Sequence, residues 1–194
     1  MDQLGKRGVA DLEEATRVGL QVAVEDEARQ ALLGAEWVIA SPSIPPSNPM
    51  WRAMAEAGVH VTTTTDLWFA QFGDRTIAVT GSKGKSTTTT LVEAVLRQCG
   101  MSPEVGGNIG RGFFDLDPAA EVFVVEVGSN QSARLAHSPA GGILTALFPE
   151  HLDWHGSIDA YFDAKINLFS HGTRSEEHTS ELQSHLNPRM PSSA

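Results

Sequence analysis

Residues 77–90 read IAVTGSKGKSTTTT, and this stretch decides how the rest of the chain is understood. The apolar run Ile77–Val79 predicts a strand, and residues 91–96 (LVEAVL) predict the body of a helix. Between them lies a glycine loop that ends in Gly84-Lys85-Ser86, where the helix begins. Glycines let the loop turn its N–H groups inward, and the helix N-terminus adds partial positive charge. The stretch therefore predicts a phosphate-binding loop.

Two side chains of the loop suit a nucleoside triphosphate that carries magnesium. Lys85 can reach the outer phosphates, and the Ser86 hydroxyl can ligate Mg²⁺. The loop is shorter than the usual pattern, because Val79 stands where that pattern has glycine. An ordinary tight turn is the alternative, but a Gly-Lys-Ser triplet at a strand-to-helix junction favours a phosphate-binding loop. The predicted nucleotide-binding residues here are Gly81, Ser82, Lys83, Gly84, Lys85, Ser86 and Thr87.

The bulk composition is that of a soluble globular chain with one or two small domains. Of its 194 residues, 41% are hydrophobic and 20% are charged. The net charge of −10 argues against nucleic acid or an anionic membrane as a partner. No apolar run approaches the ~20 residues of a membrane helix, and no secretory signal opens the sequence. A single cysteine excludes an internal disulfide, so we expect a cytoplasmic protein.

Strand and helix patterns alternate along the chain. Helices are predicted at residues 25–33, 50–57, 66–72 and 157–170, and strands at 36–40, 59–63, 75–80, 121–127 and 142–148, with a weaker strand near Glu104. Alternation of this kind is typical of a parallel sheet covered by helices. The sequence therefore predicts an α/β fold with a mostly parallel sheet. We place a domain boundary at Gly73-Asp74, where one helix pattern ends.

Several polar side chains follow the predicted strands. Glu126 ends an apolar run, and a buried carboxylate needs a cation or hydrogen bonds, although a solvent-facing glutamate is the alternative. His151 and Asp153 follow the next strand, at the edge where α/β sheets place ligands. Asn108 lies in a glycine-rich turn, and the bare motif favours a turn asparagine over a ligand-binding one. His155 is expected to be exposed.

The last predicted helix, residues 157–170, carries a tyrosine and a lysine on one face. Ser157 can cap its start. Its apolar side is formed by Ile158, Phe162, Ile166 and Phe169. Tyr161 and Lys165 are spaced i, i+4 and share a neighbouring face. Taken alone, this pattern predicts an ordinary surface lysine at position 165.

Five motifs between residues 36 and 170 share their order with one enzyme family. They are SPSIPPSNP at 41–49, TGSKGKSTTTT at 80–90, GNIG at 107–110, VVEV at 124–127, and HLD at 151–153 followed by Tyr161 and Lys165. Together they resemble the Mur ligases, the ATP-dependent amino-acid ligases of peptidoglycan precursor synthesis. The proline-rich segment resembles the D-glutamate-adding members in particular. Folylpolyglutamate synthases share the loop and should lack that segment.

The resemblance implies an enzyme, an ATP-dependent amide-forming ligase. Such a ligase would add D-glutamate to UDP-N-acetylmuramoyl-L-alanine through an acyl phosphate. Catalytic roles would fall to Lys85, His151 and Lys165. Asn108 would lie between ATP and the sugar nucleotide. Two alternatives stay open: another Mur or folylpolyglutamate-type ligase, and a nucleotide-binding paralogue without catalysis.

The resemblance also implies ATP and Mg²⁺ as cofactors. Ser86 and Glu126 would hold a first Mg²⁺ beside the phosphates. His151 would hold a second, together with Lys165 in carbamylated form, because a carbamate offers anionic oxygen. Two such ions would neutralise the charge that gathers when a carboxylate meets a γ-phosphate.

The family architecture implies an arrangement of domains. Residues 1–72 would be part of a Rossmann-like N-terminal domain for the UDP substrate, and 73–173 the first part of a P-loop-type central ATP-binding domain. Residues 174–194 are expected to be a non-native or disordered tail. We expect a fragment that is inactive alone, because the opening glycine-rich turn and a third, amino-acid-binding domain are missing. The full-length protein is expected to be a monomer.

Overall fold

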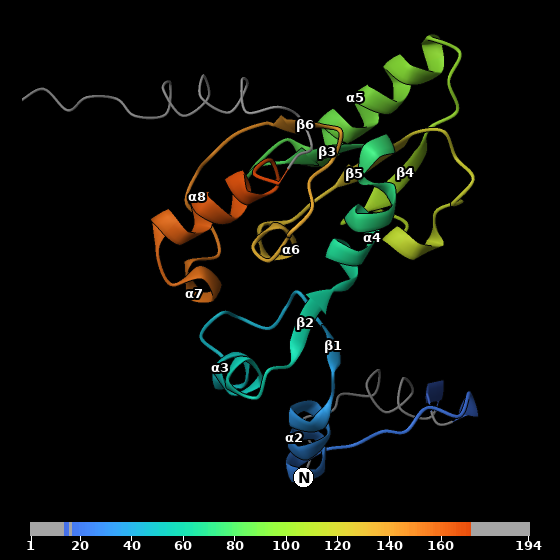
Figure 1. Ribbon diagram of the computed structural model, residues 1–194. Helices are drawn as coiled ribbons and strands as arrows, with labels where there is room; N and C mark the ends of the chain where they lie inside the picture. Colours follow the sequence, from blue (N-terminus) through green and yellow to red (C-terminus); the bar gives the residue numbers. More distant parts are fainter. Residues whose placement is uncertain (1–13, 16, 172–194) are drawn as a thin grey trace, which may run out of the picture. The chain divides into compact units, whose positions relative to one another are not determined.

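The computed structural model describes residues 14–15 and 17–171 (Figure 1). The described residues form two compact units. The first contains residues up to Val38 together with Asn48–Val61, and the second contains Ile39–Ser47 and the residues from Thr62 onward. The tail predicted at 174–194 lies outside the described residues. The predicted domain boundary at residue 73 stays a prediction, while the compact units part between Val61 and Thr62.

The first part of the chain alternates between helix and strand as predicted. Its elements are α2 (Glu25–Gly34), β1 (Trp37–Ala40), α3 (Pro49–Glu56) and β2 (His60–Thr63), and β1 and β2 form a two-stranded sheet. Asn48 starts α3 by accepting a hydrogen bond from the Met50 amide, and Pro49 occupies the first turn. The prediction that residues 36–40 form a buried strand is half right. Val38 and Ala40 are buried, whereas Trp37 and Ile39 are exposed.

The second unit is built on a four-stranded parallel sheet in the order β4-β5-β3-β6. Its strands are β3 (Thr76–Thr80), β4 (Glu104–Gly107), β5 (Phe123–Glu126) and β6 (Gly141–Leu144). Its helices are α4 (Thr64–Phe72), α5 (Lys85–Gln98), α6 (Ser129–Ser132), α7 (Leu152–His155) and α8 (Ile158–Asn167), with short 3₁₀ turns η1 (Gly73–Arg75) and η2 (Phe113–Asp115). The predicted α/β class with a parallel sheet is confirmed.

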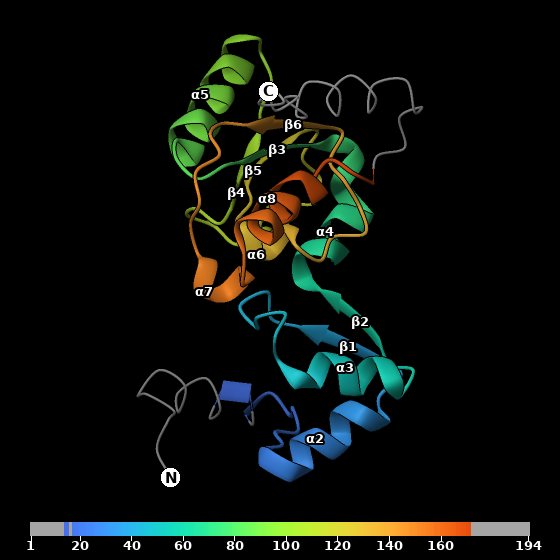
Figure 2. The ribbon, with the colours of Figure 1, turned by 90° about the vertical axis from the view of Figure 1, so that its left-hand side faces the viewer.

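Helices cover both faces of this sheet. Figures 1 and 2 show α5 on one face and α4, α6 and α8 on the other. The core on the second face is aromatic and aliphatic; its members are Trp68, Phe69, Phe72, Ala78, Phe113, Leu116, Phe123, Val125, Val127, Leu135 and Leu168. Strand β5 is buried along its whole length, as its near-continuous apolar run predicts for a central parallel strand. The sheet therefore packs against a hydrophobic core on this face, which stabilises the positions of its strands.

The strand register brings the functional loops to one edge. Val79 of β3 and Gly107 of β4 both pair with Glu126 of β5. Thr80 pairs with Leu144 of β6. Because all four strands are parallel, the segments that follow them leave the sheet side by side. Strand β6 ends at Leu144, so the predicted strand over 142–148 is too long at its C-terminal end.

Helix α8 buries a different face from the one that its apolar spacing predicts. The buried side chains are Tyr161, Ala164 and Lys165, followed by Leu168 just beyond the helix. Ile158 at the start of the predicted apolar face is instead exposed. The prediction that Ser157 caps the helix is confirmed, since its side chain accepts a hydrogen bond from the Ala160 amide. Among the described residues, no helix has the length and apolar character needed to cross a bilayer.

Candidate functional site

The glycine loop joins β3 to α5 as the sequence predicts. Gly84 precedes the helix with φ +84°, and Gly81 leaves the strand with φ +141°. A Cβ at Gly81 would collide with the Thr145 side chain, so this position requires glycine. The Ser82 amide donates to the Ala146 carbonyl at 2.7 Å, which ties the loop to the segment after β6. The conformation of the loop is therefore stabilised by the segment after β6 as well as by its own turns.

Lys85 lies at the first position of α5 and is folded back over the loop. Its Nζ lies 3.3 Å from the Ser82 carbonyl oxygen, a weak contact. An ammonium held this loosely at a helix N-terminus can turn toward phosphate oxygens. Lys85 therefore lies beside the loop, and its role at the phosphates stays a prediction.

Three predicted residues meet at the end of β5. The Ser86 hydroxyl donates to Glu126 Oε2 at 2.7 Å, and the Asn108 side-chain amide donates to Glu126 Oε1 at 3.2 Å. Glu126 is only 3% exposed, so these bonds satisfy a carboxylate that water does not reach. The Asn108 backbone amide also donates to the Glu126 carbonyl at 2.8 Å. Asn108 therefore contacts Glu126 and lines the pocket, and its role toward a ligand stays a prediction.

Lys165 is buried against the strand end of β3. It is 2% exposed, and its Nζ donates to Thr80 Oγ1 at 3.1 Å and to the Gly81 carbonyl at 3.0 Å. Burial, together with the neighbouring Lys85 charge, lowers the pKa of Lys165 to about 8. The prediction of an ordinary surface lysine, made from the helix pattern alone, is wrong.

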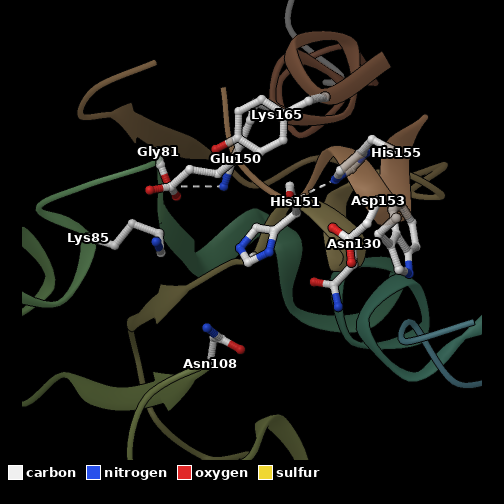
Figure 3. Close-up of a pocket in the computed structure, with 13 residues that line it drawn as sticks. Gly81, Lys85, Asn108, Asn130, Glu150, His151, Asp153, His155 and Lys165 are labelled. Carbon is white, nitrogen blue, oxygen red and sulfur yellow. Dashed lines mark hydrogen bonds between the residues drawn. The ribbon is translucent and has the colours of Figure 1, made fainter. Parts of the chain in front are cut away.

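Lys85, Asn108 and Lys165 line one pocket of about 350 Å³. Its lining residues are Gly81, Lys85, Asn108, Gly128, Ser129, Asn130, Glu150, His151, Asp153, Trp154, His155, Tyr161 and Lys165. Figure 3 shows Lys85, His151 and Asn108 around a common space, with Lys165 near Gly81. The pocket thus brings together the three predicted catalytic residues, Lys85, His151 and Lys165.

The segment after β6 supplies charged groups at the rim. His151 is exposed and takes a left-handed conformation, φ +53°, at the start of α7. Glu150 forms an ion pair with Lys83 of the loop at 3.0 Å. The hydrogen bond from Lys83 lowers the pKa of Glu150, so this carboxyl is ionised at neutral pH. Asp153 is exposed and also faces the pocket.

Two further pocket residues were not assigned a role by sequence reasoning. His155 is buried, so the expectation that it is exposed is wrong. Its Nε2 lies 2.9 Å from Ser129 Oγ. Tyr161 is fully buried, and its hydroxyl lies 2.6 Å from Ser82 Oγ. The i, i+4 spacing from Tyr161 to Lys165 signals a shared face, whereas nothing in the local pattern marks His155.

Comparison with known proteins identifies the family. Residues 79–178 match the family model described as the Mur ligase middle domain. The chain belongs to the Mur ligase family. The matched region begins inside β3 and contains the loop, Glu126, His151 and Lys165, so it covers the pocket of this Mur ligase chain.

Curated relatives carry two different names. A UDP-N-acetylmuramoyl-L-alanine--L-glutamate ligase of Salinispora tropica is 44% identical over 147 residues, which make up 76% of this chain and 33% of the relative. A UDP-N-acetylmuramoylalanine--D-glutamate ligase of Cereibacter sphaeroides is 42% identical over 162 residues, 74% of this chain and 34% of the relative. The chain therefore spans about a third of the length of these relatives.

A solved structure supports the fold. The UDP-N-acetylmuramate:L-alanyl-gamma-D-glutamyl-meso-diaminopimelate ligase of Neisseria meningitides aligns with a TM-score of 0.50 at 16% identity. The alignment covers 89% of this chain and 63% of that chain. At this level of identity the likeness bears on the fold alone.

In this Mur ligase chain, the side chains beside the phosphate loop offer suitable ligands for one of the two predicted metal ions. Ser86 and Glu126 present a hydroxyl and a carboxylate beside the loop, which are the hard oxygen ligands that Mg²⁺ prefers. The described residues contain no group of three or more His, Cys, Asp or Glu placed to hold a metal, so phosphates and water would complete the shell. Lys165 as an amine offers no anionic oxygen, and it fits the second ion only after carbamylation.

Proposed function

We propose that the chain carries the ATP site of a ligase that joins glutamate to UDP-N-acetylmuramoyl-L-alanine. The single observation that carries this proposal is the hydrogen bond from loop residue Ser86 to the buried Glu126. A phosphate loop whose serine touches a buried carboxylate is suited to a nucleoside triphosphate with its metal. The names of the relatives support the substrates.

The reaction proposed has two steps. The carboxylate of the alanyl substrate attacks the γ-phosphorus of ATP, so that an acyl phosphate forms and ADP leaves. The amine of glutamate then attacks the acyl carbon, an amide forms, a proton is lost and phosphate leaves. Lys85 would stabilise the charge on the transferred phosphoryl group, and Asn108 would orient the acyl substrate. Mg²⁺ held by Ser86 and Glu126 would supply charge neutralisation when bound.

Lys165 is proposed to act in carbamylated form. A pKa near 8 leaves an appreciable fraction of neutral amine at neutral pH, and only the neutral amine adds to carbon dioxide. The carbamate and His151 would hold a second Mg²⁺. Lys165→Ala should therefore lose activity and partly regain it with added short-chain carboxylic acids, which replace the missing oxygens. Full activity of Lys165→Ala without such acids would show that the lysine plays no part.

The configuration of the glutamate separates two candidate functions. The proline-rich segment at 41–49 favours D-glutamate, as the name of the Cereibacter sphaeroides relative does. The name of the Salinispora tropica relative favours L-glutamate as the second candidate. The two predict different products from labelled D- and L-glutamate, which chromatography resolves.

The test uses the intact protein that carries these residues. With ATP, Mg²⁺, UDP-N-acetylmuramoyl-L-alanine and D-glutamate, we expect ADP, phosphate and the ligated product in equal amounts. L-glutamate in place of D-glutamate tests the second candidate. Phosphate release that depends on neither glutamate isomer would point to another amino-acid ligase. ATP binding without any phosphate release would point to a non-catalytic paralogue.

The magnesium site has a test that does not need catalysis. In wild type, ATP should bind more tightly with Mg²⁺ than without it. Glu126→Gln keeps the size of the side chain and removes its charge, so the gain from Mg²⁺ should fall about tenfold or more. Glu104→Gln on β4 is the control, because Glu104 pairs with Arg111 away from the pocket. Equal Mg²⁺ dependence in both variants would remove Glu126 from the site.

The setting of the protein follows from the proposed reaction. A ligase that consumes ATP is expected in the cytoplasm. We also keep the expectation drawn from the sequence that the full-length protein is a monomer with no nucleic-acid or membrane partner.

A further inference from the structure

A set of packed side chains runs along the wall of the pocket and is not used in the proposed reaction. We call it the His155 network, and it consists of Ser82, Ser129, Trp154, His155 and Tyr161. It connects the phosphate loop, α6, α7 and α8. All but Ser82 are among the residues that line the pocket.

At one end of the network, the Ser82 side chain is fully hydrogen-bonded. Its hydroxyl lies 2.7 Å from the Phe148 carbonyl, 2.9 Å from the Phe148 amide and 2.6 Å from the Tyr161 hydroxyl. A serine has one hydrogen to give and two lone pairs to fill. If that hydrogen goes to the Phe148 carbonyl, the phenol of Tyr161 must donate to Ser82. Burial raises the pKa of Tyr161, which keeps the phenol protonated.

In the middle of the network, His155 holds the Tyr161 ring. The two rings meet edge to face with centroids 5.2 Å apart and an interplanar angle of 84°. The Trp154 and His155 rings also pack together, with centroids 4.4 Å apart, and the Trp154 indole N–H donates to the Ser43 carbonyl at 2.9 Å. His155 Nε2 is fixed on Ser129 Oγ at 2.9 Å. The imidazole thus has two aromatic neighbours and one hydrogen-bond partner.

The local backbone turns His155 into the pocket wall. Helix α7 has only four residues, and His155 is the buried one. The residues that flank α7, His151 and Gly156, both take left-handed conformations, so the chain turns sharply before and after the helix. Burial lowers the pKa of His155, with the charges of His151 and Lys165 acting in the same direction. The ring is therefore neutral at neutral pH, and a neutral imidazole packs well among aromatic rings.

We propose that His155 is a positioning residue for the phosphate loop: it holds the Tyr161 ring so that the phenol stays on Ser82 and the loop keeps the shape that receives phosphates. The inference rests on ATP binding as set out under the proposed function. Because phosphoryl transfer depends on positioning, a loop that loses this support should bind the triphosphate less tightly.

The experiment measures ATP affinity of the 194-residue chain by titration calorimetry in the presence of Mg²⁺. We expect His155→Ala to weaken binding about tenfold and His155→Gln, whose amide can still reach Ser129, to weaken it less. Tyr161→Phe keeps the ring and removes the phenol, so it should resemble His155→Ala. His171→Gln, an exposed histidine outside this pocket, is the control and should bind as wild type does.

A chemical rescue separates positioning from general destabilisation. Added imidazole can enter the space left in His155→Ala from the pocket, and it should restore ATP affinity without changing that of wild type. Tyr161 is the only tyrosine of the chain, so selective labelling gives one ring resonance that should move in His155→Ala and return with imidazole. If His155→Ala does not fold, the ATP affinities of His155→Gln and Tyr161→Phe test the inference instead. Wild-type affinity in both of these variants would overturn the inference.

The outcome also distinguishes this inference from the proposed function. If wild type itself fails to bind ATP, the proposed function is wrong. The Tyr161 resonance still reports whether His155 holds the ring, and an unchanged resonance in His155→Ala would overturn the positioning role by itself.

Discussion

At the scale of single residues, Lys85 is the most direct test of the phosphate loop. Lys85→Ala should abolish ligase activity of the intact protein and leave the fold unchanged, since the side chain makes only a weak contact within its own loop. Loss of one charge directed at a transferred phosphoryl group costs about 3 kcal/mol of transition-state stabilisation, or roughly a hundredfold or more in rate. The measurement is glutamate-dependent phosphate release at saturating ATP. Arg97→Ala, in the last turn of the same helix, should keep its rate.

Lys165 makes a second prediction, which concerns pH and stability. Its pKa falls from 10.5 in the unfolded chain to about 8 in the folded one, so between these values the unfolded state binds more protons. Stability should therefore rise with pH across this window, by about 3 kcal/mol in total from Lys165. Lys165→Met removes the buried charge and should be the more stable protein at pH 7. Urea unfolding at several pH values should show this advantage shrinking above pH 8, and a constant difference would contradict the assignment.

At the scale of elements, the strands and the loop were predictable, and parts of the site were not. Glycine spacing and apolar runs predict β3, the loop and α5, because these elements obey local rules. Helix α8 does not, since its inner face carries Tyr161 and Lys165 toward the pocket in place of the most apolar side. His155 sits on a four-residue helix, too short for any period, so only the packing reveals its burial. For Lys165, the helix pattern predicted a surface position, and only the resemblance to Mur ligases predicted a position at the site.

The end of β4 makes an element-scale prediction through two glycines. Gly107 (φ +93°) and Gly110 (φ +64°) both take left-handed conformations. A Cβ at Gly107 would collide with the Glu126 backbone, whereas Gly110 faces open space. Gly110→Ala should cost roughly 1–2 kcal/mol of stability from strain alone, and Gly107→Ala should cost more and also weaken Mg²⁺-dependent ATP binding. Thermal unfolding of the two variants compares them, and equal losses would show that the contact with β5 is unimportant.

At the scale of the whole molecule, the chain should bind nucleotide weakly and not ligate by itself. It holds the loop, Glu126 and Lys165, yet it spans about a third of the length of its curated relatives. Nucleotide binding depends on local geometry, whereas ligation also needs a site for the amino acid. The check is phosphate release by the purified 194-residue chain with all substrates. Steady release that depends on glutamate would show that the chain is sufficient.

The hydrogen bonds around Glu126 have a consequence for how the metal arrives and leaves. A carboxylate already satisfied by Ser86 and Asn108 gains little from a lone cation, which would have to displace one of these donors and shed water. The balance changes when the ion comes already chelated by a triphosphate, because the phosphates neutralise its charge and have already replaced part of its water shell. The protein should therefore bind dissolved Mg²⁺ weakly. It should take up and release the metal together with the nucleotide, as one complex, once in every turnover.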